Sequence, residues 1–310
     1  MKKNSTIYVA GHSGLIGSGI LRQLHAAGYK NILTKPRQEL DLRDKIQVEK
    51  FFANNKPDYV FLAAAKSGGI YANNTYPAEF IYDNLAIQTN VVNSAYKYNV
   101  KKLLFLVSSC VYPKFCKQPM KEDYLLTGSI EPTNEPFAIA KLAGFKMCQA
   151  YNRQYKTNFI SAIPANVYGI NDHFKESAHV LASLVKKFHE AKIKNLNSVT
   201  VWGSGNPKRE FIFVGDVARA CIFLMQKYNS NEIINIGTGI ETSIKTLAGL
   251  VAKITGFKGK VMYDTAKPDG NQRRLLDSRK IKKTGWKPNV KLEQGLKLTY
   301  EWYKNLTVIE

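Results

Sequence analysis

The stretch YVAGHSGLIGSGI, residues 8–20, places three glycines between an apolar run and a helical pattern, at Gly11, Gly14 and Gly17. At the first junction of a βα unit, the first glycine permits a tight turn and the second lets the backbone approach a pyrophosphate. The third allows close packing of helix on strand, and the N-terminus of the helix offers amide donors. The stretch therefore predicts a dinucleotide-binding turn. A glycine turn that serves packing alone is the alternative.

Short apolar runs alternate with helical patterns through the first half of the chain. The expected strands lie in TIYVA, NILT, YVFLAAA and KLLFLVSS, and the helices between them run to about Gly28, through Phe51 and Phe52, and from about Pro77 to Tyr98. Such alternation indicates βαβ units with right-handed crossovers and a parallel sheet covered on both faces. We predict an α/β fold with a doubly wound, parallel Rossmann-type sheet.

After FISAIPANVYG the rhythm becomes irregular, with polar loops at 171–178, 203–210 and 264–274 and one more strand in EIINIGTG. The chain has 310 residues, more than most single domains, so a second, smaller α/β substrate-binding lobe is expected. The expected division is a Rossmann domain of residues 1–166 plus about 211–240, and a lobe of about 167–210 plus 241–310.

The net charge is +21, from 45 Lys and Arg against 24 Asp and Glu, which favours an anionic partner. The basic residues are spread along the chain, and no nucleic-acid-binding module is visible. We therefore expect a phosphate-rich small ligand rather than nucleic acid. No stretch approaches the ~20 apolar residues of a membrane span. No membrane partner is expected.

The opening MKKNSTIYVAGHSG lacks the apolar segment of a signal peptide. The four cysteines of the chain, Cys110, Cys116, Cys148 and Cys221, show no CxxC or metal-like spacing. A reduced, cytoplasmic protein without a metal site is the simplest interpretation.

The second expected strand is followed by KPRQELDL, which supplies Lys35 and Arg37 and no acid before Glu39. An acid at the end of this strand favours NAD, whereas basic residues accept the 2′-phosphate of NADP. We predict NADP(H), with Arg37 as the phosphate partner. A solvated basic loop is the alternative.

The expected helix at 77–98 is apolar on two sides, although a helix that covers one face of a sheet needs a single apolar stripe. One stripe holds Ile81, Leu85, Val92 and Ala95, and the other holds Phe80, Ile87 and Val91. A homodimer through helices at about 77–98 and 136–155 would explain the surplus. A helix buried inside the monomer would explain it equally well.

The segments FLVSSCVYP and EPFAIAK complete, with the glycine turn, a pattern similar to the extended short-chain dehydrogenases/reductases. Further segments in order along nearly the whole chain resemble the GDP-L-fucose synthase family: AAAKSGGIYANNTYPAEFIYDN, SSCVYPK, EPTNEPFAIAK, YNRQY, WGSGNPKREFI, INIGTG and KPDGNQRRLLD. The resemblance implies an NADPH-dependent oxidoreductase of nucleotide-sugar biosynthesis. Its substrate would be a GDP-4-keto-6-deoxy sugar, epimerised at C3 and C5 and then reduced at C4.

The resemblance also assigns the chemistry to particular side chains. Ser108 would hydrogen-bond the C4 carbonyl oxygen, and Lys141 would hold the nicotinamide ribose. Cys110 and His179 match the acid–base pair of the epimerisations, because protons next to a ketone are acidic enough for such a pair to invert the carbon. A packing cysteine and a surface histidine are the alternatives.

Two sets of binding residues follow from the same resemblance. The cofactor set is Gly11, Ser13, Gly14, Leu15, Ile16, Gly17, Lys35, Arg37, Asp41, Leu42, Ala63, Ala64, Lys141, Pro164, Asn166 and His179. The substrate set is Ser108, Asn166, Lys187, Trp202, Arg209 and Lys267. An aromatic ring suits a planar base and cations suit a diphosphate. Trp202 could instead belong to the core of the lobe, and Arg209 is expected in a loop.

This chain departs from the family at two positions. The family's glycine turn reads GHRG, with an arginine that helps to grip the 2′-phosphate, and Ser13 stands in its place here. The family's EPYAIAK reads EPFAIAK here, so Phe137 replaces the tyrosine that delivers a proton. Losing a positioned general acid costs ~10²–10⁴ in rate, or about 3–5 kcal/mol of barrier.

A chain that keeps the binding residues and lacks one hydroxyl is expected to be an inactivated form that traps substrate. Phe137 is also compatible with a natural epimerase that uses only Cys110 and His179, with rescue by a nearby tyrosine, and with a non-catalytic nucleotide-sugar or NADP sensor. A C4-reductase of GDP-4-keto-6-deoxy-heptose for capsule or lipopolysaccharide, without epimerase activity, is the alternative enzyme.

Overall fold

The computed structural model describes residues 1–174, 179–267 and 269–307. Six strands form one sheet in the order β2-β1-β3-β4-β5-β9, and each neighbouring pair is parallel. They are β1 (Ile7–Ala10), β2 (Ile32–Leu33), β3 (Tyr59–Leu62), β4 (Lys102–Leu106), β5 (Phe159–Pro164) and β9 (Ile234–Ile236). The strand order reverses between β1 and β3, so the predicted doubly wound α/β fold is confirmed.

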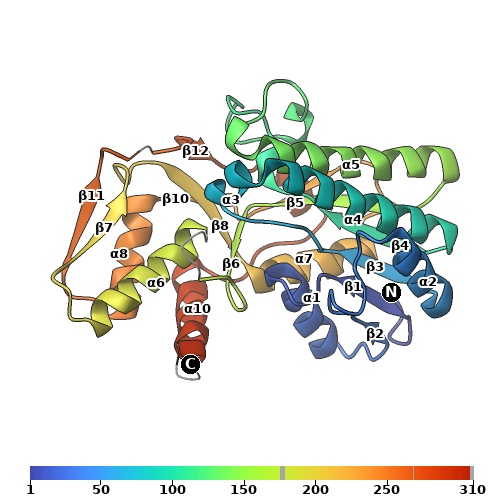
Figure 1. The fold of residues 1–310 in the computed structure, drawn as a ribbon, viewed down its shortest axis with the longest axis horizontal. Helices are drawn as coiled ribbons and strands as arrows, with labels where there is room; N and C mark the ends of the chain where they lie inside the picture. The colour runs from blue at the N-terminus through green and yellow to red at the C-terminus, as the bar shows by residue number, and fades with distance from the viewer. Residues whose placement is uncertain (175–178, 268, 308–310) are drawn as a thin grey trace.

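Helices cover both faces of this sheet (Figure 1). On one face α1 (Leu15–Ala26) packs against α7 (Val214–Lys227), and on the other lie α2 (Lys45–Asn55), α4 (Pro77–Lys97) and α5 (Glu135–Tyr155). Because the sheet is enclosed on both sides, β1, β4 and β5 are buried along their whole length. The expected strand YVFLAAA is shorter than its apolar run: β3 ends at Leu62, and Ala63–Ala65 belong to the loop that follows.

The expected long helix is α4, and its inner face differs from the expectation. Buried polar side chains, Asp83, Asn84 and Gln88, share that face with apolar ones. Gln88 Nε2 donates 2.5 Å to the carbonyl of Ala140 in α5, and Asp83 accepts from Arg43. A hydrogen bond therefore joins α4 to α5, and an ion pair joins α4 to the loop before α2. Ile81 and Leu85 of the predicted stripe are only half-buried.

The smaller lobe contains most of the remaining elements (Figure 1). They are β6 (Asn166–Tyr168), α6 (Val180–Ile193), β7 (Ser198–Trp202), β8 (Lys208–Phe213), β10 (Glu241–Ser243), α8 (Ile244–Thr255), β11 (Lys260–Asp264), β12 (Arg273–Arg274) and α10 (Leu292–Thr307). Strand β8 lies between β10 and β12 and also pairs with β6, while β7 and β11 form a separate parallel ribbon. Short helices complete the chain: α3 (Ile70–Thr75), α9 (Arg279–Lys283) and the 3₁₀ turns η1 (Ser109–Val111), η2 (Glu122–Tyr124) and η3 (Pro132–Asn134).

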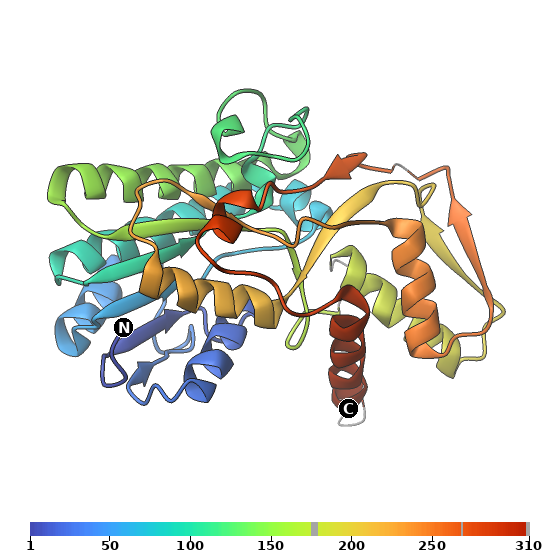
Figure 2. The same ribbon diagram turned by 180° about the vertical axis from the view of Figure 1, so that it is seen from behind.

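Buried apolar side chains gather in two clusters, one under each lobe. Val167 in β6 packs against both, so β6 marks the junction between them. Leu276, Ile281 and Trp286 belong to the larger cluster although they are near the end of the chain. Figure 2 shows this stretch crossing the back of the large lobe before α10. No helix in the described ranges is long and apolar enough to cross a membrane.

Candidate functional site

The glycine turn lies at the carboxyl end of β1, against the end of β3. Gly11 has a φ of +83°, and a Cβ there would lie 2.6 Å from the backbone nitrogen of Ala64. A Cβ on Gly17 would lie 1.9 Å from the carbonyl oxygen of Gly11. Neither position admits a side chain, because the obstructing atoms are backbone. A Cβ on Gly14 would make only an ordinary contact, at 3.5 Å, so Gly14 is not required for packing.

Helix α1 begins directly after this turn with its first amides uncapped. Its N-cap is Gly14, which supplies no side-chain acceptor to the first turn. Free amides at a helix N-terminus form a ready anion site. Leu15 packs against the small cluster and Ile16 against the large one, so the start of α1 lies where the lobes meet.

The predicted 2′-phosphate residues lie on the surface after β2. Lys35 pairs with Glu39 at 2.5 Å, and Arg37 Nε lies 3.8 Å from Asp41. Asp41 itself is held by Arg43, whose hydrogen bonds lower the pKa of that carboxyl to about 2. Asp41 is thus held by an ion pair with Arg43, while the side chains of Lys35 and Arg37 are exposed.

Ser13, which replaces the family's arginine, is exposed. Its carbonyl accepts a hydrogen bond of 2.7 Å from Asn171 Nδ2. Arg22 Nη2 donates 3.4 Å to the carbonyl of Ile170. The loop after β6 is therefore fastened over the glycine turn. Leu42 is also anchored, because its carbonyl accepts from Asn90 in α4.

Four predicted catalytic residues meet at the carboxyl end of β4. Lys141 is buried in α5, and its Nζ donates 3.0 Å to the carbonyl of Leu106, the last residue of β4. Burial lowers the pKa of Lys141 to about 8, with the nearby Cys110 acting in the opposite direction. The ring of Phe137, one turn earlier, has its centroid 5.9 Å from this Nζ. Ser108 begins the turn after β4, and its Oγ accepts 3.5 Å from the amide of Cys110.

Phe137 keeps its ring in a defined position without a hydroxyl. It is half-buried, and it meets Phe80 edge to face at 6.4 Å between ring centroids. Tyr112, the tyrosine of the SSCVYP segment, is buried, and its hydroxyl already has a partner because it donates 2.8 Å to Asn235 Oδ1. Burial raises the pKa of Tyr112, which keeps that hydroxyl neutral.

The predicted acid–base pair comes from both lobes. Cys110 is half-buried in η1, where burial raises the pKa of its thiol and Ser108, Arg274 and Lys141 act in the opposite direction. His179 is the N-cap of α6 and is exposed, yet surrounding protein atoms crowd the imidazole enough to lower the pKa of His179. Within the described residues no hydrogen bond joins the two.

Three predicted substrate residues meet on the small lobe. Trp202 ends β7 with 67% of its surface exposed, so it is not part of the lobe core. The Nζ atoms of Lys187, from α6, and Lys267, beyond β11, each lie 5.7 Å from the centroid of the Trp202 indole. An exposed ring with two cations above it suits a planar base joined to phosphates.

Arg209 lies in β8, not in the loop expected from the sequence. In the pairing of β8 with β12 it stands opposite Arg274. Burial lowers the pKa of Arg209 to about 10, and the charge of Arg274 adds to this effect. Arg274 was not among the residues predicted from the sequence. Its only sequence signal was its place in the QRRLLD segment. The short pairing of β12 with β8 brings it to the site.

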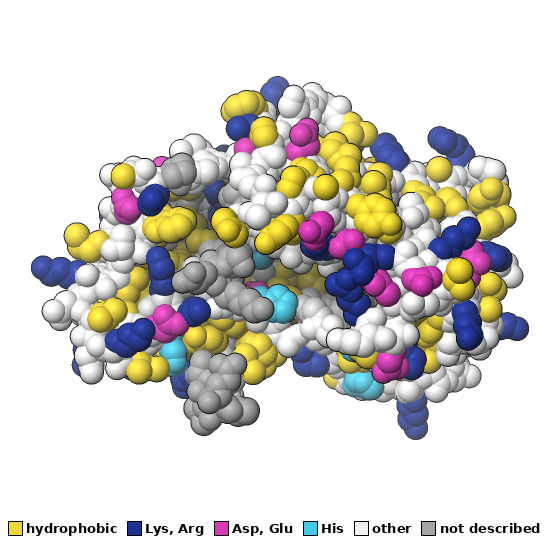
Figure 3. All heavy atoms as spheres, viewed as in Figure 1, with side chains coloured by type: hydrophobic (Ala, Val, Ile, Leu, Met, Phe, Trp, Pro, Cys, Tyr) yellow, Lys and Arg dark blue, Asp and Glu magenta, His cyan; other side chains and the backbone are white. Residues whose placement is uncertain are grey.

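Asn166 and Pro164 flank the point where the chain leaves the large sheet. Pro164 ends β5 and is buried, and Asn166 Nδ2 donates 2.8 Å to the carbonyl of Glu210. The two residues thus lie at the lobe junction. In Figure 3 the surface is hollowed between the lobes, and basic side chains are scattered over this face among acidic ones.

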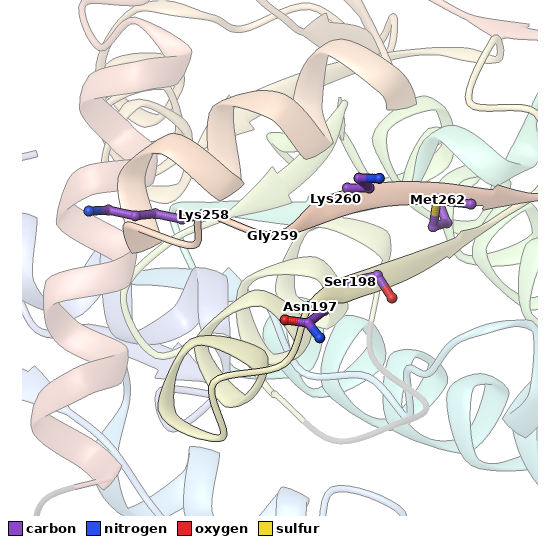
Figure 4. A pocket seen from close by; sticks show the side chains of 6 residues that line it. All are labelled: Asn197, Ser198, Lys258, Gly259, Lys260 and Met262. Atoms are coloured by element: carbon purple, nitrogen blue, oxygen red, sulfur yellow. The ribbon is translucent and has the colours of Figure 1, made fainter.

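An open hollow of about 580 Å³ lies elsewhere, beside the β7–β11 ribbon. It is lined by Asn197, Ser198, Lys258, Gly259, Lys260 and Met262 (Figure 4). Lys258 points away from Asn197 and Ser198, so the cations do not converge on one point. None of the predicted site residues lines it. The described residues also include no group of three or more His, Cys, Asp or Glu side chains arranged to hold a metal.

The fold and the glycine turn define a dinucleotide-binding α/β protein, and comparison with known proteins narrows the class. Residues 7–237 match the model of the NAD dependent epimerase/dehydratase family. GDP-L-fucose synthase 1 of Arabidopsis thaliana is 55% identical over 302 residues, which cover 97% of this chain and 94% of that protein.

Two solved structures from Campylobacter jejuni are also similar. One is a GDP-6-OMe-4-keto-L-xylo-heptose reductase, with a TM-score of 0.92 and 40% identity over 99% of both chains. The other is a GDP-mannoheptose C4 reductase with NADP bound, with a TM-score of 0.91 and 42% identity over 98% of this chain and 99% of that one. The chain therefore belongs to the GDP-L-fucose synthase group of the NAD dependent epimerase/dehydratase family.

Proposed function

We propose that this chain binds NADP(H) at the carboxyl ends of β1, β3 and β4 and acts on the C4 ketone of a GDP-linked 4-keto-6-deoxy sugar. The observation that carries the proposal is the meeting of the glycine turn, the Ser108 turn and the buried Lys141 at one edge of the sheet. Ligands of open α/β sheets bind outside this edge, where the strand order reverses. The relatives above, which are GDP-sugar synthases and reductases, support the substrate class.

The roles of the side chains follow from their positions. NADPH, when bound, supplies a hydride to C4, and a proton must reach the oxygen of that carbon. Ser108 would hydrogen-bond this oxygen, and Lys141 would hold the nicotinamide ribose while its charge stabilises the developing alkoxide. Lys35 and Arg37, exposed beyond β2, would meet the 2′-phosphate without help from residue 13.

The nucleotide would lie on the small lobe. Its base would contact Trp202, and Lys187, Lys267 and Arg209 would neutralise the diphosphate. Asn166, at the lobe junction, would contact the sugar between the two halves. The sugar would then extend from the junction toward the Ser108 turn of the large lobe.

Phe137 removes the proton donor from an otherwise complete reductase site. The ring remains beside Lys141 and Phe80, so binding of cofactor and substrate should persist. The hydroxyl that would protonate the C4 oxygen is missing, and Tyr112 is committed to Asn235. The chain therefore binds cofactor and substrate but reduces the C4 ketone slowly.

The test is Phe137→Tyr, assayed by NADPH consumption on GDP-4-keto-6-deoxymannose. The rate should rise by ~10²–10⁴ because a general acid is restored. Phe115→Tyr is a matched control, since Phe115 is 91% exposed and should gain nothing. Adding Lys141→Met to Phe137→Tyr should remove the gain.

Failure of Phe137→Tyr to gain activity on any GDP-4-keto sugar would contradict the reductase assignment. If the same protein still bound NADPH and nucleotide sugar tightly, it would be a non-catalytic binding protein. Product stereochemistry by NMR would decide the sugar. A panel of hexose and heptose substrates is needed because the similar structures act on heptoses.

Epimerisation needs neither Phe137 nor a hydride. Cys110 and His179 would remove a proton from one face of C3 or C5 and return a proton on the other. The present chain should therefore exchange deuterium from solvent into the keto sugar, and Cys110→Ser should stop that exchange. A protein that reduces C4 after Phe137→Tyr but shows no exchange would be a plain C4-reductase.

Three broader features complete the proposal. The chain would divide into the two domains expected from the sequence, although Leu276, Ile281 and Trp286 pack in the large core.

A homodimer would form through the exposed sides of α4 and α5, where Tyr82 is 68% and Ile139 41% exposed. The cytoplasmic location stays a prediction from the composition.

A further inference from the structure

The guanidinium of Arg274 lies at the lobe junction and contacts the turn that carries the proposed catalytic residues Ser108 and Cys110. Its Nη1 donates 2.9 Å to the carbonyl of Ser109, the residue between Ser108 and Cys110. With the Asn271 amide in its flipped orientation, the side-chain oxygen of Asn271 accepts from Nε and Nη2 of Arg274 at 3.2 and 3.3 Å. Both partners are neutral, and among the described residues no carboxylate forms an ion pair with Arg274.

The half-buried guanidinium of Arg274 has neutral hydrogen-bond partners, so its charge acts on the pKa of the ionisable groups around it. Burial lowers the pKa of Arg274, and Cys110, Glu131 and Cys116 act in the opposite direction. The same interaction seen from the thiol favours the charged form of Cys110. The other groups that favour this thiolate are the Ser108 hydroxyl and the ammonium of Lys141 from α5. Arg274 is the one among them that belongs to the small lobe.

We propose that Arg274 is a positioning residue for Cys110. It holds the Ser108–Cys110 turn through the Ser109 carbonyl, and its positive charge near the sulfur favours the thiolate more than burial alone would allow. The importance of this arrangement for catalysis rests on the epimerisation proposed above. There, a base takes a proton from the carbon next to the C4 ketone, and the electron pair moves onto the C4 oxygen. An acid on the opposite face then returns a proton to that carbon, and both groups exchange protons with water.

The neighbouring Arg273 provides a matched control. The two arginines are successive residues of β12, so their side chains point to opposite sides of the strand. Arg273 is exposed, and its Nε pairs with Glu241 at 2.5 Å. It therefore has the same side chain and nearly the same place in the sequence, without the contact to the Ser109 carbonyl.

The experiment is the pH dependence of alkylation of Cys110 by iodoacetamide in the full chain, read by mass spectrometry. Trypsin cleaves after Lys114, so Cys110 and Cys116 fall in different peptides. Arg274→Met should raise the midpoint by about one pH unit, which is about a tenfold slower reaction at a fixed pH below it. Arg273→Met should leave the midpoint unchanged. Arg274→Lys, which keeps the charge, should stay close to the parent.

An unchanged midpoint in Arg274→Met, or an equal shift in Arg273→Met, would overturn the proposal. NADPH titration shows whether each variant is folded. If Arg274→Met does not fold, the test uses Arg274→Lys instead. An alkylation midpoint that rises by a full pH unit in Arg274→Lys, which retains the charge, would contradict the inference. The readout needs no turnover. A shifted midpoint together with an inactive Phe137→Tyr protein would support the inference while refuting the proposed function.

Discussion

The proposed cofactor side and the proposed nucleotide side of this site are built in different ways. At the glycine turn the fit is made by backbone: a Cβ on Gly17 would lie 1.9 Å from the carbonyl of Gly11. On the small lobe, side chains from three separate segments, Lys187, Trp202 and Lys267, gather in solvent. Gly11 and Gly17 of the first region should tolerate almost no substitution. Substitutions in the second region should change the affinity for the nucleotide sugar while the fold stays intact.

The largest effect is expected at the turn. Gly17→Ala should lower the free energy of unfolding by at least about 3 kcal/mol, because backbone atoms cannot move away from the added methyl group. Urea unfolding measures this. Gly249→Ala is the control, since α8 has open space there and the substitution should stabilise by about 0.5–1 kcal/mol. Equal stabilities for the two variants would contradict the difference between the regions.

The buried Lys141 should make stability depend on pH on the cofactor side. Its pKa falls from 10.5 to about 8 on folding, because burial disfavours the charged form. Between these values the unfolded chain binds more protons, so the free energy of unfolding should rise with pH. The rise attributable to Lys141 should be about 1–3 kcal/mol, the second largest of these effects.

The measurement is the difference between this chain and Lys141→Met across that pH range. Lys102 is also buried, and its pKa is likewise lowered to about 8. It is present in both proteins, so its contribution cancels in the difference. If the free energy of unfolding of the two proteins changed with pH in parallel, the pKa of Lys141 would not be lowered by burial.

The smallest effect is expected on the small lobe, and it should act on affinity alone. Trp202→Ala, made in the Phe137→Tyr form, should raise the KM for the GDP sugar about tenfold, or about 1.4 kcal/mol. The free energy of unfolding should change by less than about 0.5 kcal/mol because the ring is exposed. Met262→Ala, on the neighbouring strand and 51% exposed, should alter neither quantity. A large loss of stability in Trp202→Ala would show that the ring supports the lobe.

Much of the fold could be predicted from local patterns. The apolar runs at β1, β3, β4 and β5 are short and buried, and the helices between them are long, so their periods are clear. The small lobe was harder because β10 and β12 have three and two residues, too short to show any period. Arg209 was expected in a loop because glycines and a proline precede it in GSGNPKREF, yet it lies near the start of β8.

The site shows the same division. Phe137 and Lys141 share one turn of a helix, so their proximity follows from their spacing. The contact of Arg274 with the Ser109 carbonyl joins positions 165 residues apart and has no local signal. The cluster around Trp202 is similar, because Lys187 and Lys267 reach it from an α-helix and from beyond a strand.

The sequence by itself determined the turn, the alternation of strands and helices, and the ring that stands where the family has a tyrosine. These features depend on neighbours a few residues apart, where backbone geometry leaves few choices. Only the tertiary structure decided which cations are paired, which tyrosine is committed elsewhere, and that Arg274 reaches the turn of Cys110. Such contacts depend on how two lobes close over one edge of a sheet, and residue spacing does not encode that distance.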